Sequence, residues 1–569
     1  MTSETAATAT ATLVAARALA HQAEALADAA IARAAELTRG GAGIDAHQVL
    51  CERLALIATE ARAARALVEY AERLRTAGKP DALSEEQALT YAADVVHRIA
   101  SVRQAHPGDF ADLPALSQQA GEMVRAGMDD ARLREIGARV IESRGVNGVE
   151  LDNDDAASTR AFARQFAKQE VLREEDGIAL ADRIHRDDLL IPDSLIRQYA
   201  ELGFFGSSVP DAYGGTEMGY LTMTVLTEEL SQASLIAGSL LTRSEILTRA
   251  LIEGGTEAQK QHWLPKIASG EILVGISVTE PDIGSDVASM QCKATPAQVD
   301  GASGWLLNGA KAWCTFAGRA NVLALLARTD ADATNRNARV SLFIVPKDVS
   351  YDHKFACQQP TGGLLTGEAI PTPGYRGMHS YILNLENYFV PGENLVGEES
   401  GRGRGLYLTL GGFAIGRLQT AGRALGVAQA ALEKACQYTT QRVQFGKPIS
   451  EYQLTQYKIG LMATRIAAAR QLTYDVARGK DPTASGRDVP SAMAKLFASD
   501  VAVWVTQEAQ LLHGGWGYAE EDRISRYVVD AQVLAIFEGV KAILELRVIA
   551  RGLVSAPVGA GTQEGRVGA

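Results

Sequence analysis

The chain contains 569 residues, of which 47% are hydrophobic and 22% charged, so it is long enough for several domains, each with its own core. Its formal net charge of −12 disfavours long-range attraction to DNA, RNA or an anionic membrane surface. This balance is typical of a globular protein and argues against nucleic acid as a partner.

The cysteine pattern argues against a disulfide framework and against a zinc site. The cysteines are far apart and include no CxxC pair; they are Cys51, Cys292, Cys314, Cys357 and Cys436. We expect no bound metal. The N-terminal residues lack the features of a signal peptide, and no run reaches the roughly 18 apolar residues of a membrane span. We therefore expect a cytoplasmic protein without a membrane partner.

Residues 1–152 are rich in Ala, Leu, Arg and Glu and repeat apolar residues at helical spacing. Breaks occur at Gly40-Gly41, at residues 78–80 and at Pro107-Gly108. These features predict an extra N-terminal helical domain of roughly four to six helices. A second helical domain is expected over residues 159–274.

Residues 275–398 differ, because short β-rich runs are bounded there by Gly, Asn and Pro, and we expect a β-domain. Helical periodicity returns over residues 402–552 and is absent from residues 553–569, which predicts a C-terminal helical bundle and a disordered tail. The elements do not alternate as βαβ units do, and no GxGxxG follows a strand. A Rossmann nucleotide site therefore has no support.

Residues 278–286 read VTEPDIGSD and open the predicted β-domain. Such a polar turn presents backbone N–H groups and hydroxyls that can hold the polar edge of a ring. An ordinary capped loop between a helix and a strand has the same pattern.

Residues 307–315 read LNGAKAWCT. Because Asn-Gly is a strong hairpin signal, we expect a turn at Asn308-Gly309. Strand alternation then places Trp313 and Thr315 on one face and Cys314 on the other. A core tryptophan beside a solvent-facing threonine is the alternative interpretation.

Two further segments carry an arginine and a glycine pair. Arg442 and Phe445-Gly446 follow a long predicted helix, and residues 513–518 read HGGWGY. A guanidinium can donate two parallel hydrogen bonds to the oxygens of a phosphate, and glycines let the backbone approach a ligand closely. However, the helix dipole alone also favours an arginine at a helix C-terminus.

The fourth segment, residues 536–540, reads IFEGV. An unpaired buried carboxylate costs several kcal/mol or shifts its pKa upward, so Glu538 in this apolar run is a candidate for proton transfer. A partnered Glu at the start of a helix is the alternative interpretation.

Together, the four segments resemble the acyl-CoA dehydrogenase family in order and spacing, and the resemblance covers residues 160–552. It implies an α+β multidomain fold with a helical domain, a central β-barrel-like domain and a C-terminal four-helix bundle, to which this chain adds its all-helical extension. It also implies an FAD-dependent enzyme that dehydrogenates an acyl-CoA between its α and β carbons. Glu538 occupies the position of the base, whereas the base position of a minority of the family is Gly416 here.

The resemblance also assigns binding roles. At the flavin it places Val278, Thr279, Trp313, Thr315, Arg442, Phe445, Gly514 and Gly515. At coenzyme A or the acyl group it places Ser285, Phe413, Arg417 and Gly539. The family's usual residues are replaced at Phe316, Leu511 and Val540, so we expect fewer side-chain contacts to the flavin there.

The long N-terminal extension and an insertion at residues 366–371 resemble one branch of the family, which converts (2S)-methylsuccinyl-CoA to mesaconyl-CoA in the ethylmalonyl-CoA pathway. That substrate carries a free carboxylate, which is costly to bury without a cation or several donors. Our hypothesis is that Arg243, helped by Thr242, binds this carboxylate. The alternative is that Arg243 pairs with a surface acid.

The resemblance implies electron-transferring flavoprotein as the electron acceptor and a homodimer or homotetramer as the assembly. Four other functions remain open from the sequence. They are dehydrogenation of another short or branched acyl-CoA, an acyl-CoA oxidase, and, from another class, a flavin-bearing nucleic-acid-binding protein or a helical assembly protein without activity.

Overall fold

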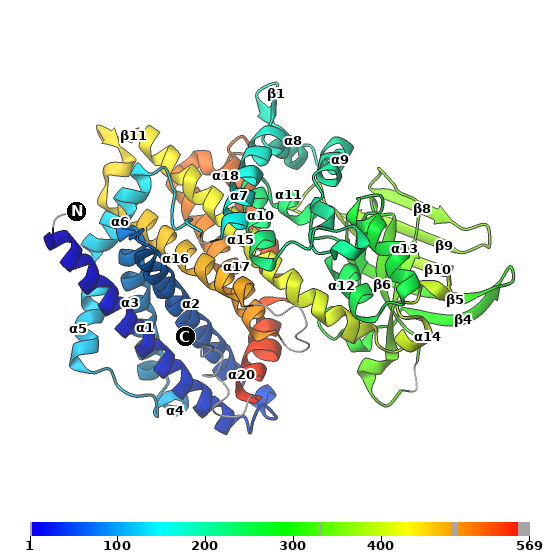
Figure 1. Ribbon diagram of the computed structural model, residues 1–569, viewed down its shortest axis with the longest axis horizontal. Helices are drawn as coiled ribbons and strands as arrows, with labels where there is room; N and C mark the ends of the chain where they lie inside the picture. The colour runs from blue at the N-terminus through cyan, green and yellow to red at the C-terminus, as the bar shows by residue number, and fades with distance from the viewer. Residues whose placement is uncertain (1–2, 152, 331–332, 480–487, 556–569) are drawn as a thin grey trace. The chain divides into compact units, whose positions relative to one another are not determined.

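The computed structural model describes residues 3–151, 153–330, 333–479 and 488–555 (Figure 1). The chain folds into two compact units, each with more contacts within itself than to the other. The first contains Met1–Asp152, Thr420–Asp481 and Arg487–Ala569, and the second contains Asn153–Gln419 and Pro482–Gly486. The long helix α15 (Gly405–Gln441) contributes residues to both units. The predicted disordered tail lies outside the described residues from residue 556 onward.

The first unit is helical. Its N-terminal part contains α1 (Ser3–Leu37), α2 (Gln48–Thr76), α3 (Ala82–Ala105), α4 (Pro107–Phe110), α5 (Gln118–Gly127) and α6 (Asp130–Glu142). Its C-terminal part contains α16 (Gln453–Arg478), α17 (Val489–His513), α18 (Arg523–Leu534), α19 (Lys541–Ile543), the π-helix η10 (Leu544–Ala550) and α20 (Arg551–Ser555).

The predicted helix breaks at Gly40-Gly41, residues 78–80 and Pro107-Gly108 are confirmed. The side chain of Asp81 caps α3 by accepting from the backbone N–H groups of Leu83 and Ser84.

The extension shares a core with the C-terminal helices of this unit. Helices α1, α2 and α3 lie side by side (Figure 1), and α2 packs on α17 and η10. The shared cluster consists of Ala55, Ala58, Ala492, Met493, Leu496, Leu544 and Ile549. Residues at opposite ends of the sequence thus bury one another's apolar surface.

Helices α6 and α16 cross with their backbones in close contact, and a glycine on each helix permits it. A Cβ atom at Gly137 would lie 1.8 Å from the carbonyl oxygen of Gln456. A Cβ atom at Gly460 would lie 2.1 Å from the carbonyl oxygen of Leu133. No other residue type fits either position without separating the helices.

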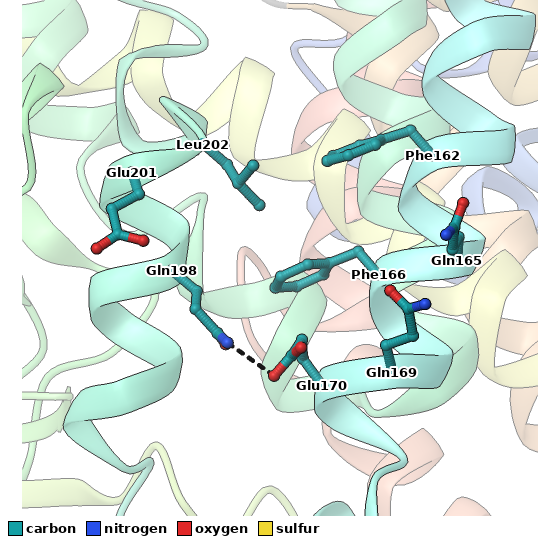
Figure 2. A pocket seen from close by; sticks show the side chains of 8 residues that line it. All are labelled: Phe162, Gln165, Phe166, Gln169, Glu170, Gln198, Glu201 and Leu202. Carbon is teal, nitrogen blue, oxygen red and sulfur yellow. Dashed lines mark hydrogen bonds between the residues drawn. The ribbon is translucent and has the colours of Figure 1, made fainter.

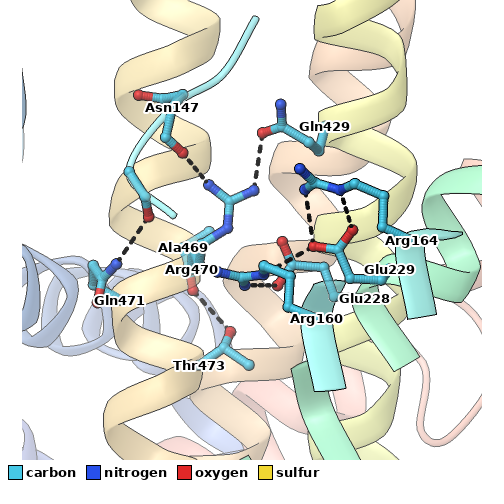
Figure 3. Close-up of polar contacts among 11 residues, drawn as sticks. Asn147, Arg160, Arg164, Glu228, Glu229, Gln429, Ala469, Arg470, Gln471 and Thr473 are labelled. Atoms are coloured by element: carbon cyan, nitrogen blue, oxygen red, sulfur yellow. Dashed lines mark hydrogen bonds and ion pairs between the residues drawn. The ribbon is translucent and has the colours of Figure 1, made fainter. Parts of the chain in front are cut away.

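A buried polar network also joins the extension to α15 and α16 (Figure 3). The guanidinium of Arg470, which is fully buried, donates to the carbonyl oxygen of Asn147 at 2.7 Å and to Oε1 of Gln429 at 2.9 Å. Gln429 in turn donates to the carbonyl oxygen of Gly145 at 2.8 Å, and Gln87 donates to Oδ1 of Asn147 at 2.6 Å. These buried donors therefore find acceptors on segments far apart in the sequence.

The second unit begins with helices. They are α7 (Asp154–Phe166), the π-helix η2 (Ala167–Val171), α8 (Leu180–Arg186), α9 (Asp193–Glu201), α10 (Tyr220–Ala233), α11 (Leu235–Leu240), α12 (Glu245–Gly254) and α13 (Glu257–Ala268). A buried ion-pair cluster ties α7 to α10 (Figure 3), because the carboxylate of Glu229 accepts from Arg160 at 2.9 Å and from Arg164 at 3.0 Å. A short hairpin, β1 (Glu174–Glu175) and β2 (Ile178–Ala179), lies between η2 and α8.

The β-domain of this unit is one mixed sheet. Its strands are β3 (Val274–Ser277), β4 (Lys293–Val299), β5 (Ala302–Thr315), β6 (Val322–Arg328), β7 (Val340–Pro346), β8 (Lys354–Gln358), β9 (Leu364–Ile370) and β10 (Ser380–Pro391). Their order is β3-β6-β4-β5-β10-β9-β8, with β7 also pairing with β6. The short helix α14 (Glu398–Gly401) then precedes α15.

Strand β6 is buried on both faces. Its residues Leu323 and Leu325 belong to one buried cluster, whereas Val322, Ala324 and Leu326 belong to a second cluster that includes residues of α12 and α13. A strand covered on both sides reads as a continuous apolar run rather than as an alternating one. The first cluster is the core of the β-domain itself, and the second packs β6 against α12 and α13.

Candidate active site

Glu538 lies in a tight turn in the first unit, between the end of α18 and α19. Its backbone has φ 55° and that of Gly539 has φ 101°, so the turn uses left-handed backbone at two successive residues. The side chain is half-buried. The turn is closed by hydrogen bonds from the N–H of Lys541 to Ala535 O at 3.1 Å and from the N–H of Phe537 to Val533 O at 3.0 Å.

Two buried cations hold the residues on either side of Glu538. The guanidinium of Arg423, on α15, lies 5.0 Å from the ring centroid of Phe537, within the range of a cation–π contact. The ammonium of Lys495, on α17, donates to the carbonyl oxygen of Gly539 at 2.8 Å. Arg423 and Lys495 are each 1% exposed. The turn that carries Glu538 is therefore held by contacts to both of its neighbours.

The segment at Val278 and Thr279 is held by a buried ion pair in the second unit. Lys311 is fully buried, and its ammonium donates to the Glu280 carboxylate at 3.0 Å and to Val278 O at 3.1 Å. The same carboxylate accepts from the N–H of Cys292 at 2.9 Å. Thr279 O accepts from the backbone of β5, so the loop is fixed beside this strand.

The predicted hairpin at Asn308-Gly309 is wrong. Both residues lie inside β5, which continues unbroken to Thr315. Gly309 has φ 141°, and a Cβ atom there would lie 2.7 Å from the Cα atom of Cys292. The glycine is needed for close approach of the neighbouring chain, and Asn308 Oδ1 accepts from the N–H of Asn387 at 2.9 Å at an irregularity in β10.

The end of β5 presents Trp313 outward. Trp313 has φ 58° and is 57% exposed, whereas Cys314 is fully buried. This pattern confirms the predicted faces and contradicts a core tryptophan. The hydroxyl of Thr315 lies 3.1 Å from that of Ser380 on β10, and the N–H of Phe316 donates to His379 O at 2.8 Å. An exposed aromatic side chain thus stands beside a fixed hydroxyl.

The segment with Arg442 and Phe445 forms a hairpin in the first unit, β11 (Val443–Gln444) and β12 (Lys447–Pro448). Phe445 occupies the turn with φ 51° and is 96% exposed. Arg442 is also exposed. The hairpin therefore presents an apolar ring and a guanidinium close together in sequence at the surface.

The backbone at Gly514 and Gly515, just after α17, is exposed to solvent. Gly514 has φ 59°, and a Cβ atom at Gly514 or Gly515 would meet no atom within 4 Å. Trp516 and Tyr518, which follow, are 57% and 89% exposed. The backbone is therefore accessible, as the sequence predicts.

Thr242 and Arg243 are buried just before α12, with 5% and 7% exposure. Nε of Arg243 donates to Ser239 O at 3.1 Å, and the Thr242 hydroxyl donates to the same oxygen at 3.1 Å. Within the described ranges Arg243 makes no ion pair, so its pairing with a surface acid is contradicted. A nearby acid, Glu245, is 2% exposed, and burial raises its pKa to about 7 although Arg249 lowers it.

Phe413 and Arg417 lie one turn apart on α15 in the second unit, and both are half-buried. Here α15 crosses α12, because a Cβ atom at Gly412 would lie 2.6 Å from the Cα atom of Ile246. This crossing brings the start of α12, which Thr242 and Arg243 precede, to the part of α15 with Phe413. Ser285 is exposed in the loop after β3.

A surface pocket lies elsewhere in the second unit, between α7 with η2 and α9 (Figure 2). Phe162 and Leu202 line it and are 46% and 40% exposed, and Gln198 donates to Glu170 at 2.7 Å across it. None of the residues predicted from the sequence lines this pocket. We do not assign it to the active site.

Three family profiles match consecutive parts of the chain. They are "Acyl-CoA dehydrogenase, N-terminal domain" over residues 153–271, "middle domain" over residues 275–388 and "C-terminal domain" over residues 403–554. A (2S)-methylsuccinyl-CoA dehydrogenase of Cereibacter sphaeroides is 36% identical over 524 residues, which cover 90% of this chain and 91% of that protein. The chain belongs to the acyl-CoA dehydrogenase family.

Solved structures agree with this assignment. Butyryl-CoA dehydrogenase from Megasphaera elsdenii is 29% identical with a TM-score of 0.63, covering 71% of this chain and 99% of that one. A glutaryl-coenzyme A dehydrogenase in complex with glutaryl-CoA is also 29% identical with a TM-score of 0.63, covering 72% of this chain and 97% of its own. The predicted fold class is confirmed.

This acyl-CoA dehydrogenase is an FAD-dependent oxidoreductase. Its residues fit the cofactor by their chemistry. An exposed indole at Trp313 and a hydroxyl at Thr315 suit a flat ring with a polar edge, and the open Gly514-Gly515 backbone and exposed Arg442 suit a diphosphate. None of the described helices is both long and apolar enough to cross a membrane.

Arg423 and Lys495, which contact the residues on either side of Glu538, were not predicted from the sequence. Lys495 is the one Lys or Arg of α17, whereas Arg423 shares α15 with Arg417 and Lys434, so the sequence offered little signal for either. A long cation at such a position usually reaches the surface, so only the structure shows that both stay buried.

Proposed function

We propose that this acyl-CoA dehydrogenase converts (2S)-methylsuccinyl-CoA to mesaconyl-CoA, as the ethylmalonyl-CoA pathway requires. The buried guanidinium of Arg243 carries the proposal, because no described residue supplies an acid to pair with it. A buried cation is stable only with an anionic partner or several acceptors. The distal carboxylate of methylsuccinyl-CoA is such a partner. Similarity to the Cereibacter sphaeroides protein over 90% of the chain, including the extension, supports the same substrate.

Glu538 is the base in this proposal. The α-C–H of a thioester is a weak acid, so its removal needs a carboxylate held at the α carbon in a site from which water is excluded. The buried contacts of Arg423 to Phe537 and of Lys495 to Gly539 limit the movement of the turn that carries Glu538. The backbone N–H of Glu538 donates to the thioester oxygen as negative charge develops there.

Bound FAD supplies the acceptor for the hydride that leaves the β carbon. In the proposal the flavin ring is held by the β-domain residues Val278, Thr279, Trp313 and Thr315. The diphosphate and adenine are held by Arg442, Phe445, Gly514 and Gly515 of a neighbouring subunit, whose exposure fits contact with a second chain. The assembly is therefore a homodimer or homotetramer.

Ser285, Phe413, Arg417 and Gly539 line the path of the pantetheine arm and acyl chain in this proposal. Electron-transferring flavoprotein is the proposed acceptor of the electrons. The cytoplasmic location expected from the sequence stays a prediction.

The base is tested with Glu538→Gln, which removes the proton acceptor and keeps the shape of the side chain. We expect flavin bleaching by (2S)-methylsuccinyl-CoA, followed anaerobically, to slow by about 10²- to 10⁴-fold. The exposed Glu520→Gln variant from the same unit is the control and should match wild type. A Glu538→Gln enzyme with normal flavin content and normal bleaching would disprove the assignment.

The substrate is tested with Arg243→Met. Loss of a buried charge pair costs about 3–5 kcal/mol, so the apparent affinity for methylsuccinyl-CoA should fall by at least about 100-fold, while that for butyryl-CoA, which has no distal carboxylate, changes little. Arg249→Met is the control, because Arg249 already pairs with Glu253 at 2.7 Å. Equal losses for both substrates, or faster bleaching of wild type by butyryl-CoA or glutaryl-CoA, would exclude methylsuccinyl-CoA.

A further inference from the structure

Three metal-ligating side chains meet in the second unit, near the end of β5 that carries Thr315. They come from three loops: Asp188 follows α8, His353 precedes β8 and His379 precedes β10. One ligand atom from each lies within 4.8 Å of the other two. The closest pair is Nε2 of His379 and Oδ1 of Asp188, at 3.2 Å.

These distances suit a small cation. In a tetrahedral site with bonds of about 2.1 Å, two ligand atoms lie roughly 3.4 Å apart. The separation of His379 from Asp188 is already close to this value. The rings of His353 and His379 lie with centroids 4.5 Å apart and an interplanar angle of 40°, and the third ligand atom lies within 4.8 Å of the other two. Metal binding therefore requires the exposed His353 side chain to move closer to them.

The fold holds His379 in place. Its side chain is 5% exposed, and its backbone oxygen accepts from the N–H of Phe316 at 2.8 Å. The Nε2 atom of this buried ring already contacts Asp188, so one candidate ligand atom is positioned beside another.

We propose that Asp188, His353 and His379 bind one zinc ion. Two imidazoles and one carboxylate are a typical three-residue zinc set, and the half-exposed Asp188 and exposed His353 leave the fourth position to water. Nε of Arg376 lies 3.7 Å from Oδ1 of Asp188, the oxygen that also contacts His379, so Arg376 competes with the ion for this atom.

The zinc ion fastens the loop after α8 to the β-domain. Hydrogen bonds already join the two, from Arg376 to His185 O at 3.0 Å and from the N–H of Ile191 to Gly377 O at 3.3 Å. His379 also precedes Ser380, whose hydroxyl contacts Thr315 at 3.1 Å. Zinc binding should therefore raise thermal stability and shift the flavin spectrum slightly.

The test is equilibrium dialysis of the purified, flavin-containing full chain against Zn²⁺ after removal of metals by a chelator. Metal content is measured by mass spectrometry and divided by chain concentration. The exposed His353→Ala and the isosteric Asp188→Asn variants remove one ligand each without opening the core. The control is His262→Ala, since His262 is exposed on α13 beside Trp263 and belongs to no metal-ligating group among the described residues.

We expect one zinc ion per wild-type chain, with affinity at least about tenfold weaker in both ligand variants and unchanged in the control. Co²⁺ in the same site should give the intense visible bands of tetrahedral coordination, and both ligand variants should lose them. Absence of stoichiometric zinc from wild type, or equal binding by wild type and the ligand variants, would overturn the proposal. Flavin content and activity with acyl-CoA, measured alongside, report separately on the proposed function.

Discussion

Glu538 occupies a backbone conformation that few non-glycine residues adopt, and it adjoins a second left-handed residue, Gly539. A residue with a side chain pays on the order of 1–3 kcal/mol of conformational energy in left-handed backbone. It keeps that conformation only where the surrounding structure imposes it. Here the fixing contacts come from cations buried on α15 and α17, Arg423 and Lys495. The turn that carries Glu538 is therefore held in its conformation by contacts from two helices.

Glu245 makes the stability of the second unit depend on pH. Its pKa is about 7 in the folded protein against an ordinary value of 4.5, because burial disfavours the charged form. Because its pKa is raised, Glu245 keeps its proton in the folded state at pH values where the unfolded state has already released it. The free energy of unfolding is therefore highest below pH 4.5 and decreases as the pH rises to about 7. The loss amounts to about 3 kcal/mol and stays constant at higher pH.

The variant Glu245→Gln should remove this dependence. Its Tm relative to wild type should rise between about pH 5 and pH 8, as measured by thermal unfolding of the flavin-containing protein. Glu253→Gln, on the more exposed side of the same helix, is the matched control and should show no such rise. A constant Tm difference between Glu245→Gln and wild type across this range would contradict the prediction.

At the residue scale, the sequence predicts side chains with distinctive motifs and misses those defined by packing. Glu538, Trp313 and the Gly514-Gly515 pair stand in recognisable segments, and the exposure of Trp313 and of the glycine pair agrees with their predicted roles. Lys495 was not predicted, since one cation in an apolar helix does not reveal whether it is buried. The error at Asn308-Gly309 has a similar cause: the motif suits a turn, but the strand continues because Gly309 makes room for Cys292.

At the scale of elements, the crossing of α6 and α16 depends on glycine. Helical periodicity predicts both helices, but it does not indicate which face of each approaches the other. A glycine inside a helix costs roughly 0.5–1 kcal/mol relative to alanine, so its presence calls for a packing reason. The reciprocal approach of Gly137 to Gln456 and of Gly460 to Leu133 provides that reason.

The variant Gly137→Ala should destabilise the protein in spite of alanine's better helix propensity. The new Cβ atom would lie 1.8 Å from a backbone oxygen, which cannot rotate away, so the helices must separate at a cost of about 1–3 kcal/mol or more. Gly121→Ala on α5 is the control, and it should raise the free energy of unfolding. Its new Cβ atom would meet only the end of the Arg125 side chain, at 3.7 Å. Urea unfolding of both variants measures the difference, and a stabilised Gly137→Ala protein would contradict the close crossing.

At the scale of the whole molecule, residues 1–152 are part of a core and not an appendage. They share one contact unit with residues 420–481 and 487–569, and their buried residues on α2 complete a cluster with α17 and η10. Composition predicts a helical extension, but the partner of an amphipathic helix cannot be read from its periodicity. The shared core could therefore be found only in the structure.

Deletion of residues 1–152 should leave an insoluble or flavin-poor protein. It exposes the apolar side chains of Met493 and Leu496 and removes the carbonyl oxygen of Asn147 from buried Arg470. Soluble yield and flavin content of the truncated chain check this prediction. Co-expression of residues 1–152 as a separate chain is the control and should restore both. A truncated chain that is soluble, fully flavin-loaded and as heat-stable as wild type would disprove it.

The hydrogen bond from Asn147 to Ala463 O, at 2.7 Å, joins residues that are 316 positions apart in the sequence. During synthesis the N-terminal helices leave the ribosome first, and at about 5–20 residues per second they wait roughly 15–60 s for α16 and longer for α17. Throughout that interval the faces of α2 and α6 that pack on α16, α17 and η10 have no final partner. Folding of this chain therefore requires contacts between residues that are far apart in the sequence. We expect slow refolding, and a greater dependence on chaperones than in shorter relatives without the extension.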